Sequence, residues 1–168
     1  WDYWGADGEP LGNTEELLSA LENAMALNNF HPGANHFYIH AIEASKTPEK
    51  GIPSAERLKE LVPGSGHLVH MPSHIFTRLG LWKESITSNI DSAESAVCYA
   101  ESVNPDANWV SEIHALDYLV YAYLQLGDNE KAQIEMDKMQ EIKQIFPTDH
   151  FASAYALIAV PARLAIEN

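Results

Sequence analysis

The 168-residue chain predicts an all-α fold built from antiparallel helix pairs. Apolar residues recur at helical spacing through most of the chain, and breaks rich in glycine and proline divide this pattern at short intervals. No stretch shows the sustained alternation of apolar and polar residues that is typical of a strand. With 46% apolar residues, the chain can form one domain with a sizeable core or one array of stacked helix pairs.

The first element is expected after an irregular lead-in. Residues 1–12 contain three glycines and one proline, and a single helical domain is predicted over 13–168. Asn13 or Thr14 can cap the first helix, because their side-chain oxygens accept hydrogen bonds from the first turn. This helix should run to about residue 28, with helically spaced apolar residues Leu17, Leu18, Leu21, Ala24, Met25 and Leu27.

Later breaks bound about seven further helices, giving about eight in all. We expect them over residues 34–45, 52–62, 66–79, 82 to the high 90s, 108–126, 129–145 and from about 150 onwards. Two prolines fall inside these segments, where proline removes a backbone hydrogen bond. Pro72 is expected either to kink the fourth helix or to move its start to near Met71, and Pro161 to kink or end the last helix.

Two segments resemble the helix–turn–helix junction of tetratricopeptide repeats, in which a glycine and small residues recur. They run from Leu79 to Ser85 (LGLWKES) and from Leu126 to Ala132 (LGDNEKA), and Phe146-Pro147 stands where such a repeat ends. The resemblance implies a right-handed α-solenoid of stacked hairpins. Gly80 and Gly127 are 47 residues apart, 13 more than one repeat of 34, so an insertion is expected near 98–107.

A narrower resemblance rests on the strings HPGANH, from His31, and GHLVHMPSH, from Gly66. They are similar to a group of bacterial tetratricopeptide-like proteins of unassigned activity, and this resemblance implies no catalytic residues. The chain opens with aromatic residues and no methionine, which predicts a fragment of a longer protein and leaves its compartment open.

Four histidines are the candidate metal ligands. His36 and His40 are four residues apart, as are His70 and His74, and the second pair follows the first at an offset of 34 residues. Stacked repeats place equivalent residues side by side, so the four imidazoles are expected to converge on one groove. Imidazole nitrogens bind Zn, Cu, Ni or Fe.

Four further residues are expected to support this site. Glu43, His67, His114 and Asp117 fall on groove-facing positions when the repeats are aligned on their glycines. The carboxylates could act as ligands, as partners of the ligating histidines or as bases. No phosphate-binding loop or dinucleotide fingerprint is present, so no nucleotide or organic cofactor is indicated.

The preferred function is therefore a binding scaffold with a histidine and carboxylate site for a transition metal. Three alternatives remain open: a protein- or peptide-binding module without metal, a metal-dependent hydrolase with an open coordination position, and a pH-responsive surface. His31 is expected to make a turn contact and His150 to lie beside a helix cap. Met136 and Met139 are expected in the core.

The net charge and the cysteine content limit which binding partners and which kinds of site the chain can have. The chain has 24 acidic against 10 basic residues, a formal charge of −14 that argues against nucleic acid and anionic membrane. Cys98 is the only cysteine, so neither an internal disulfide nor a cysteine-rich zinc site can form. No apolar run is long enough to span a membrane. A protein or peptide could bind in the groove, and end repeats could self-associate.

Overall fold

The structure, a computed structural model, confirms the predicted all-α class. It describes residues 2–148 and 150–167, and for Ala152 it describes the backbone alone. The α-helices in chain order are α1 (Thr14–Leu27), α2 (Pro32–Ile42), α3 (Ile52–Leu61), α4 (Gly66–His70), α5 (Pro72–Arg78), α6 (Trp82–Val103), α7 (Val110–Gln125), α8 (Asn129–Glu141) and α9 (Phe151–Glu167). A 3-10 turn, η1 (Pro48–Gly51), and two short strands, β1 (Asn108–Trp109) and β2 (Ile145–Phe146), complete the described elements.

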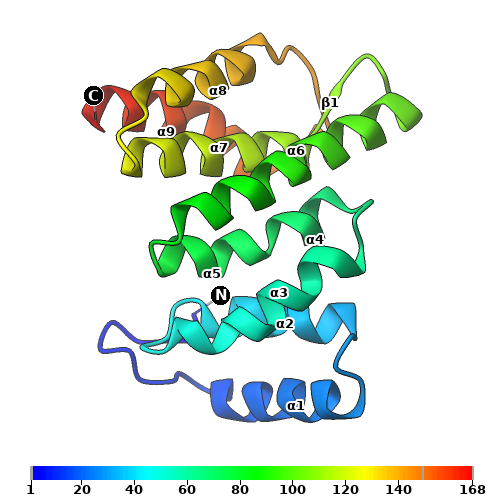
Figure 1. The fold of residues 1–168 in the computed structure, drawn as a ribbon, viewed down its shortest axis with the longest axis vertical. Coiled ribbons are helices and arrows are strands. Elements are labelled where there is room, and N and C mark those ends of the chain that lie inside the picture. The colour runs from blue at the N-terminus through cyan, green and yellow to red at the C-terminus, as the bar shows by residue number, and fades with distance from the viewer. Residues whose placement is uncertain (1, 149, 168) are drawn as a thin grey trace.

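The helices lie in successive layers along the long axis of the molecule, from α1 at one end to α8 and α9 at the other (Figure 1). Neighbours in the chain pack against each other, including α1 with α2, α6 with α7 and α7 with α8. Gly80 and Gly127 turn the chain between paired helices at φ of 71° and 70°, a conformation that glycine adopts without steric cost. The turns predicted from the two LG segments therefore lie where the helix pairs are joined.

Several boundaries differ from the sequence prediction. The sixth expected helix starts at Val110, because the two residues before it form β1, which pairs in parallel with β2. The sequence predicts a seventh helix up to residue 145, the first residue of β2, but this helix ends at Glu141. Two-residue strands are too short to leave a periodic signal. The fifth helix continues to Val103 and so contains much of the expected insertion.

Pro72 divides the expected fourth helix into α4 and α5. The helix α4 ends at His70, α5 begins at Pro72, and the intervening Met71 keeps right-handed helical angles. Proline has no N–H to continue the helical ladder, so the hydrogen-bond pattern is interrupted here while the backbone keeps helical angles. Pro161, in contrast, lies inside α9 and does not end it.

Two apolar clusters form the core. One lies among α7, α8 and α9 and includes Met136 and Met139, as predicted. The other joins α2, α3 and α5 around Ile39, Leu58 and Ile75.

Between these clusters, α6 contributes a buried face of small and polar residues: Ser85, Ser88, Asn89, Ser92, Ala96 and Ala100. These small residues let α4 approach α6 closely. A Cβ on Gly66 would lie 3.0 Å from the backbone oxygen of Ser92, and the Ser92 hydroxyl donates a 2.7 Å hydrogen bond to the Gly66 carbonyl. The histidines of α4 are therefore held against α6.

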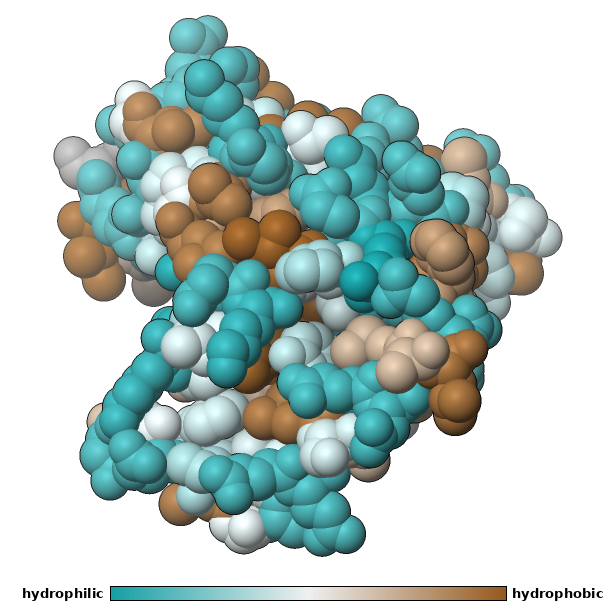
Figure 2. Space-filling view, turned by 60° about the horizontal axis from the view of Figure 1, so that its bottom comes forward, coloured by the Kyte–Doolittle hydropathy of each residue, from teal (hydrophilic) through white to brown (hydrophobic). Residues whose placement is uncertain are grey.

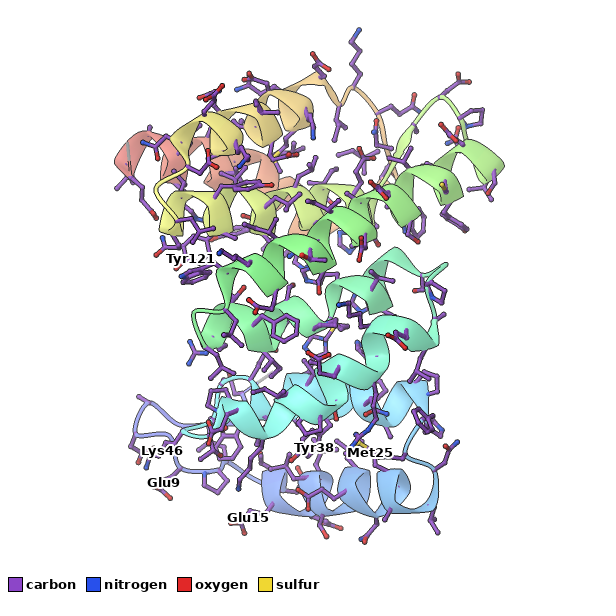
Figure 3. The ribbon with its side chains drawn as sticks, in the orientation of Figure 1. Glu9, Glu15, Met25, Tyr38, Lys46 and Tyr121 are labelled. Carbon is purple, nitrogen blue, oxygen red and sulfur yellow. The ribbon has the colours of Figure 1, made fainter. Side chains whose placement is uncertain are left out.

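The lead-in is tied to the second layer. The indole N–H of Trp4 donates to the carbonyl of Ala41 at 2.6 Å, and Lys46 pairs with Glu9 at 2.6 Å (Figure 3). The Tyr38 hydroxyl donates to Glu22 of α1 at 3.2 Å, which joins the first two helices. The lead-in thus covers one edge of the α2 layer.

The surface carries the strongly negative charge of the chain. Hydrophilic residues cover most of the face drawn in Figure 2, with hydrophobic side chains between them. At the C-terminal end, α9 leaves Phe151, Ile158 and Ile166 exposed. Self-association through this end stays a prediction. None of the described helices is both long and apolar enough to cross a membrane.

Candidate metal centre

Six histidines from four helices meet between the two core clusters. Helix α2 carries His36 and His40, α4 carries His67 and His70, α5 carries His74, and α7 carries His114. Contacts of α2 with α5 and of α4 with α7 bring these faces together. Their ligand atoms, with those of Glu43, form three groups in which all members lie within 4.8 Å of one another.

The inner group consists of His70, His74 and His114. The Nε2 atoms of His70 and His74 are 3.1 Å apart, and the ring of His114 lies 4.3 Å from that of His70 between centroids. His70 is 1% exposed, and the other two are half-buried. The inner group therefore combines a deeply buried imidazole with two that are partly accessible.

The outer group consists of His36, His40 and His67. The Nε2 atoms of His36 and His67 are 3.1 Å apart, and the ring centroids of His36 and His40 are 4.9 Å apart. His67 is exposed and the other two are half-buried. This group lies closer to solvent than the inner group.

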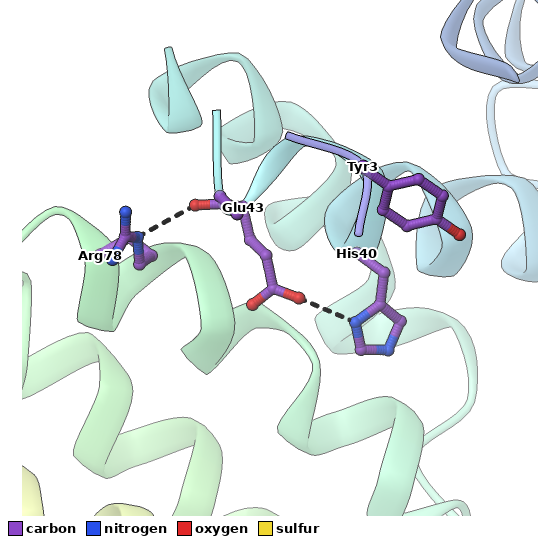
Figure 4. A pocket seen from close by; sticks show the side chains of 5 residues that line it. Tyr3, His40, Glu43 and Arg78 are labelled. Atoms are coloured by element: carbon purple, nitrogen blue, oxygen red, sulfur yellow. Dashed lines mark hydrogen bonds and ion pairs between the residues drawn. The ribbon is translucent and has the colours of Figure 1, made fainter. Parts of the chain in front are cut away.

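Glu43 joins the two groups. Its Oε1 lies 3.0 Å from Nδ1 of His40, and its Oε2 lies 2.7 Å from Nδ1 of His74. Figure 4 shows the first of these contacts, together with the hydrogen bond that Arg78 donates to the Glu43 carbonyl at 3.0 Å. Glu43 follows the last residue of α2, so its backbone is fixed by the helix end and by Arg78.

Glu43 stays ionised despite being largely buried. Burial raises the pKa of its carboxyl group, but hydrogen bonds from His40 and His74 and the charge on these imidazoles outweigh burial and lower the pKa to about 2. An ionised carboxylate can only accept hydrogen bonds. The Nδ1 atoms of both histidines must therefore carry the protons.

The hydrogen-bond network assigns the tautomer of His70 as well. The Asn89 amide nitrogen donates to the Ser85 carbonyl at 2.8 Å, so the Asn89 oxygen faces His70. That oxygen lies 2.6 Å from Nδ1 of His70, which must be the donor. The Ser73 hydroxyl lies 3.3 Å from the same nitrogen and makes a longer contact.

These assignments leave the Nε2 atoms of His70 and His74 facing each other at 3.1 Å. A proton or a metal ion shared between the two nitrogens would hold them at this distance. Zn–N bonds of 2.0–2.1 Å in tetrahedral geometry place neighbouring nitrogens about 3.3 Å apart. The observed separation is close to that value.

Burial favours the neutral form of His36, His70 and His114, the form that binds metal ions. Burial, followed by the charges of neighbouring histidines, lowers the pKa of His114 and of His36 to about 4. The pKa of His70 is lowered well below its ordinary value, again chiefly by burial. At neutral pH these side chains present lone pairs and no positive charge.

The four predicted ligands are divided between the two groups. His36 and His40 meet His67 in the outer group, whereas His70 and His74 meet His114 in the inner group. The supporting residue Asp117 belongs to neither group, because it accepts a 2.6 Å hydrogen bond from Arg163 of α9. His31 caps α2 and His150 accepts from Ser153 at the start of α9.

Two contacting residues have no counterpart in the sequence prediction. Asn89 lies on α6, which carries no candidate ligand, and the Tyr118 hydroxyl on α7 is 3.4 Å from Nδ1 of His74. The spacing of Ser85, Asn89 and Ser92 along one face of α6 was a possible signal for Asn89, because buried polar residues at helical spacing need partners.

Two pockets border the Glu43 and the His114 sides of the histidine cluster. One has a volume of about 430 Å³ and is lined by Tyr3, His40, Glu43, Ala44 and Arg78 (Figure 4). The other has a volume of about 530 Å³, and His114 and Tyr118 form part of its wall. A small molecule can therefore reach the edge of either group.

The sequence matches no family model, no curated protein and no solved structure. The tetratricopeptide resemblance therefore stays a prediction, and the function is argued from the histidine geometry.

Proposed function

We propose that this chain is a tetratricopeptide-like helical scaffold that binds a transition metal ion through the Nε2 atoms of His70, His74 and His114. The observation that carries the proposal is the 3.1 Å approach of the Nε2 atoms of His70 and His74, which is close to the spacing of two nitrogens on a zinc ion, in rings whose Nδ1 atoms are held by Asn89 and Glu43. A metal ion can take the place of the proton that the two nitrogens would otherwise share. The helix layers packed in chain order support the scaffold part of the proposal.

The second contacts of these ligands support the same conclusion. Metal-bound histidines almost always donate their other N–H to a carboxylate or a carbonyl-type oxygen, which fixes the ring. His74 has Glu43 in this position and His70 has Asn89. Three imidazoles favour Zn, Cu, Ni or Fe over Mg or Ca, which take oxygen ligands.

A metal-dependent hydrolase is the second candidate, and one observation favours it. Three protein ligands leave the fourth tetrahedral position of zinc to water, as in catalytic sites. His114 also lines the pocket of about 530 Å³, so a substrate could approach a metal-bound water there. Ester and phosphoester hydrolysis by the metal-loaded protein, lost on chelation, would separate this candidate from a storage or sensing role.

The direct experiment is a calorimetric titration of the untagged, metal-free protein with Zn²⁺, followed by metal analysis after dialysis. We expect stoichiometric binding. In His114→Gln, whose amide preserves polarity, the affinity of the inner group should fall by more than the about 10–100-fold that losing an outer-shell partner costs. His31→Asn is the matched control, because it removes a histidine outside both groups and keeps a good N-cap.

Circular dichroism must show that each variant is folded before binding is compared. Wild-type protein that binds no Zn²⁺, and whose melting temperature does not respond to Zn²⁺, Cu²⁺ or Ni²⁺, would overturn the proposal. A peptide-binding module would then be the better account.

A further inference from the structure

We infer that the outer group, His36, His40 and His67, binds a second transition metal ion, so that the chain holds two ions whose ligands are oriented by one shared carboxylate, Glu43. This inference rests on the proposed function and extends it from one ion to two.

The first argument is the pair of Nε2 atoms in the outer group. His36 and His67 bring theirs to 3.1 Å, the same separation as in the inner group and close to the about 3.3 Å edge of a tetrahedral zinc site. His67 comes from α4 and His36 from α2, so two separate helices converge to create this contact.

The third ligand is supplied by His40. Its Nδ1–H donates to Glu43, which leaves its Nε2 atom as the nitrogen available to a metal ion (Figure 4). The ring of His40 makes an edge contact with that of His36 at 4.9 Å between centroids. The outer group thus offers three imidazoles, and Glu43 orients the ring of His40 in this group as it orients the ring of His74 in the inner group.

A single ion cannot satisfy all of these ligands. An ion bound among His40, Glu43 and His74 would use the Nδ1 atoms of the two histidines. It would displace the two protons whose hydrogen bonds Glu43 accepts. Ions bound through Nε2 keep both hydrogen bonds, and each oxygen of Glu43 then orients a ligand of a different ion. Two divalent ions add +4 to a chain with a formal charge of −14, so the overall charge favours their binding.

Counting bound ions tests the inference. The full chain, freed of metal, is titrated with Co²⁺ and with Zn²⁺, and the bound metal is measured after dialysis and from the visible absorption of tetrahedral Co²⁺. We expect two ions in the wild type and one in His67→Gln. Because His67 is exposed, this variant should fold normally. His114→Gln should also keep one ion, and His31→Asn should keep two.

The outcomes separate the inference from the proposed function. One ion in the wild type that His67→Gln retains and His114→Gln loses would overturn the second ion and leave the proposed function standing. One ion that only His67→Gln loses would overturn both, because the inner group would then bind nothing. No bound ion would overturn both as well. If His67→Gln is misfolded, His36→Gln replaces it with the same expected count.

Discussion

Replacing Glu43 with glutamine tests how the histidines are oriented. In the wild type, Oε1 accepts from His40 at 3.0 Å and Oε2 accepts from His74 at 2.7 Å. Glutamine keeps one acceptor oxygen and replaces the other with an NH₂ group. That group would face an imidazole N–H, so one of the two histidines must rotate away or move its proton to Nε2. Either change removes a ligand atom from its group.

The size of the effect follows from known outer-shell substitutions. Loss of such a partner costs about 10–100-fold in metal affinity, or about 1.4–2.8 kcal/mol. We therefore expect Glu43→Gln to weaken at least one Zn²⁺ site by this factor. Glu43→Asp keeps the charge but is one methylene shorter and cannot reach both rings, so it should also weaken binding.

The assay is a competition titration of Zn²⁺ against a chelator of known affinity at pH 7. Glu49→Gln, an exposed glutamate on η1, is the control and should bind as the wild type does. If Glu43→Gln binds Zn²⁺ within twofold of the wild type at every site, the orienting role of Glu43 is refuted.

Three further predictions test neighbouring features. Asn89→Ala leaves the buried Nδ1–H of His70 without its acceptor, so urea denaturation should show a loss of about 1–3 kcal/mol in the free energy of unfolding. Asp117→Asn removes the charge that Arg163 contacts on a buried side chain and should cost about 1–3 kcal/mol while the Zn²⁺ count stays unchanged, whereas loss of an ion would make Asp117 a ligand. Burial lowers the pKa of His114 to about 4, so the unfolded chain binds more protons between pH 6.5 and 4. The urea midpoint of chelator-treated protein should therefore fall as the pH is lowered from 6.5 to 4. A constant midpoint would contradict the burial of His114 in its neutral form.

Most of the fold was predictable because its signals are local. Apolar periodicity and proline or glycine breaks predicted the helices, and the two LG segments predicted turns at Gly80 and Gly127. The pairing of β1 with β2 was not predictable, because it joins two residues from each of two distant segments. The break at Met71 was one of two outcomes that Pro72 allowed, and packing decided between them.

The sequence predicted which region holds the site but not which histidines contact each other. The offset of 34 residues holds for His40 and His74, whose ring centroids lie 5.0 Å apart. It fails for His36, which meets His67 instead, while His70 turns towards His114 on α7. The packing of the helices explains this, because α4, which carries His70, contacts α7, whereas α5, which carries His74, contacts α2.

The protonation pattern could not be read from the sequence at all. It depends on Asn89 from α6 and on the position of Glu43 between two helices, both of which are fixed by tertiary packing. The proposed metal centre depends on this pattern, since Nδ1 atoms held by Asn89 and Glu43 leave the Nε2 atoms of His70 and His74 to face each other.

Coordination of a metal ion through the Nε2 atoms of the inner group is tested most directly by long-range ¹H–¹⁵N NMR of the histidine side chains in the Zn²⁺-saturated protein. We predict that His70 and His74 carry their protons on Nδ1, and that their Nε2 resonances, together with one nitrogen of His114, shift on Zn²⁺ binding. A proton on Nε2 of His70 or His74 in the saturated protein would contradict coordination by the inner group.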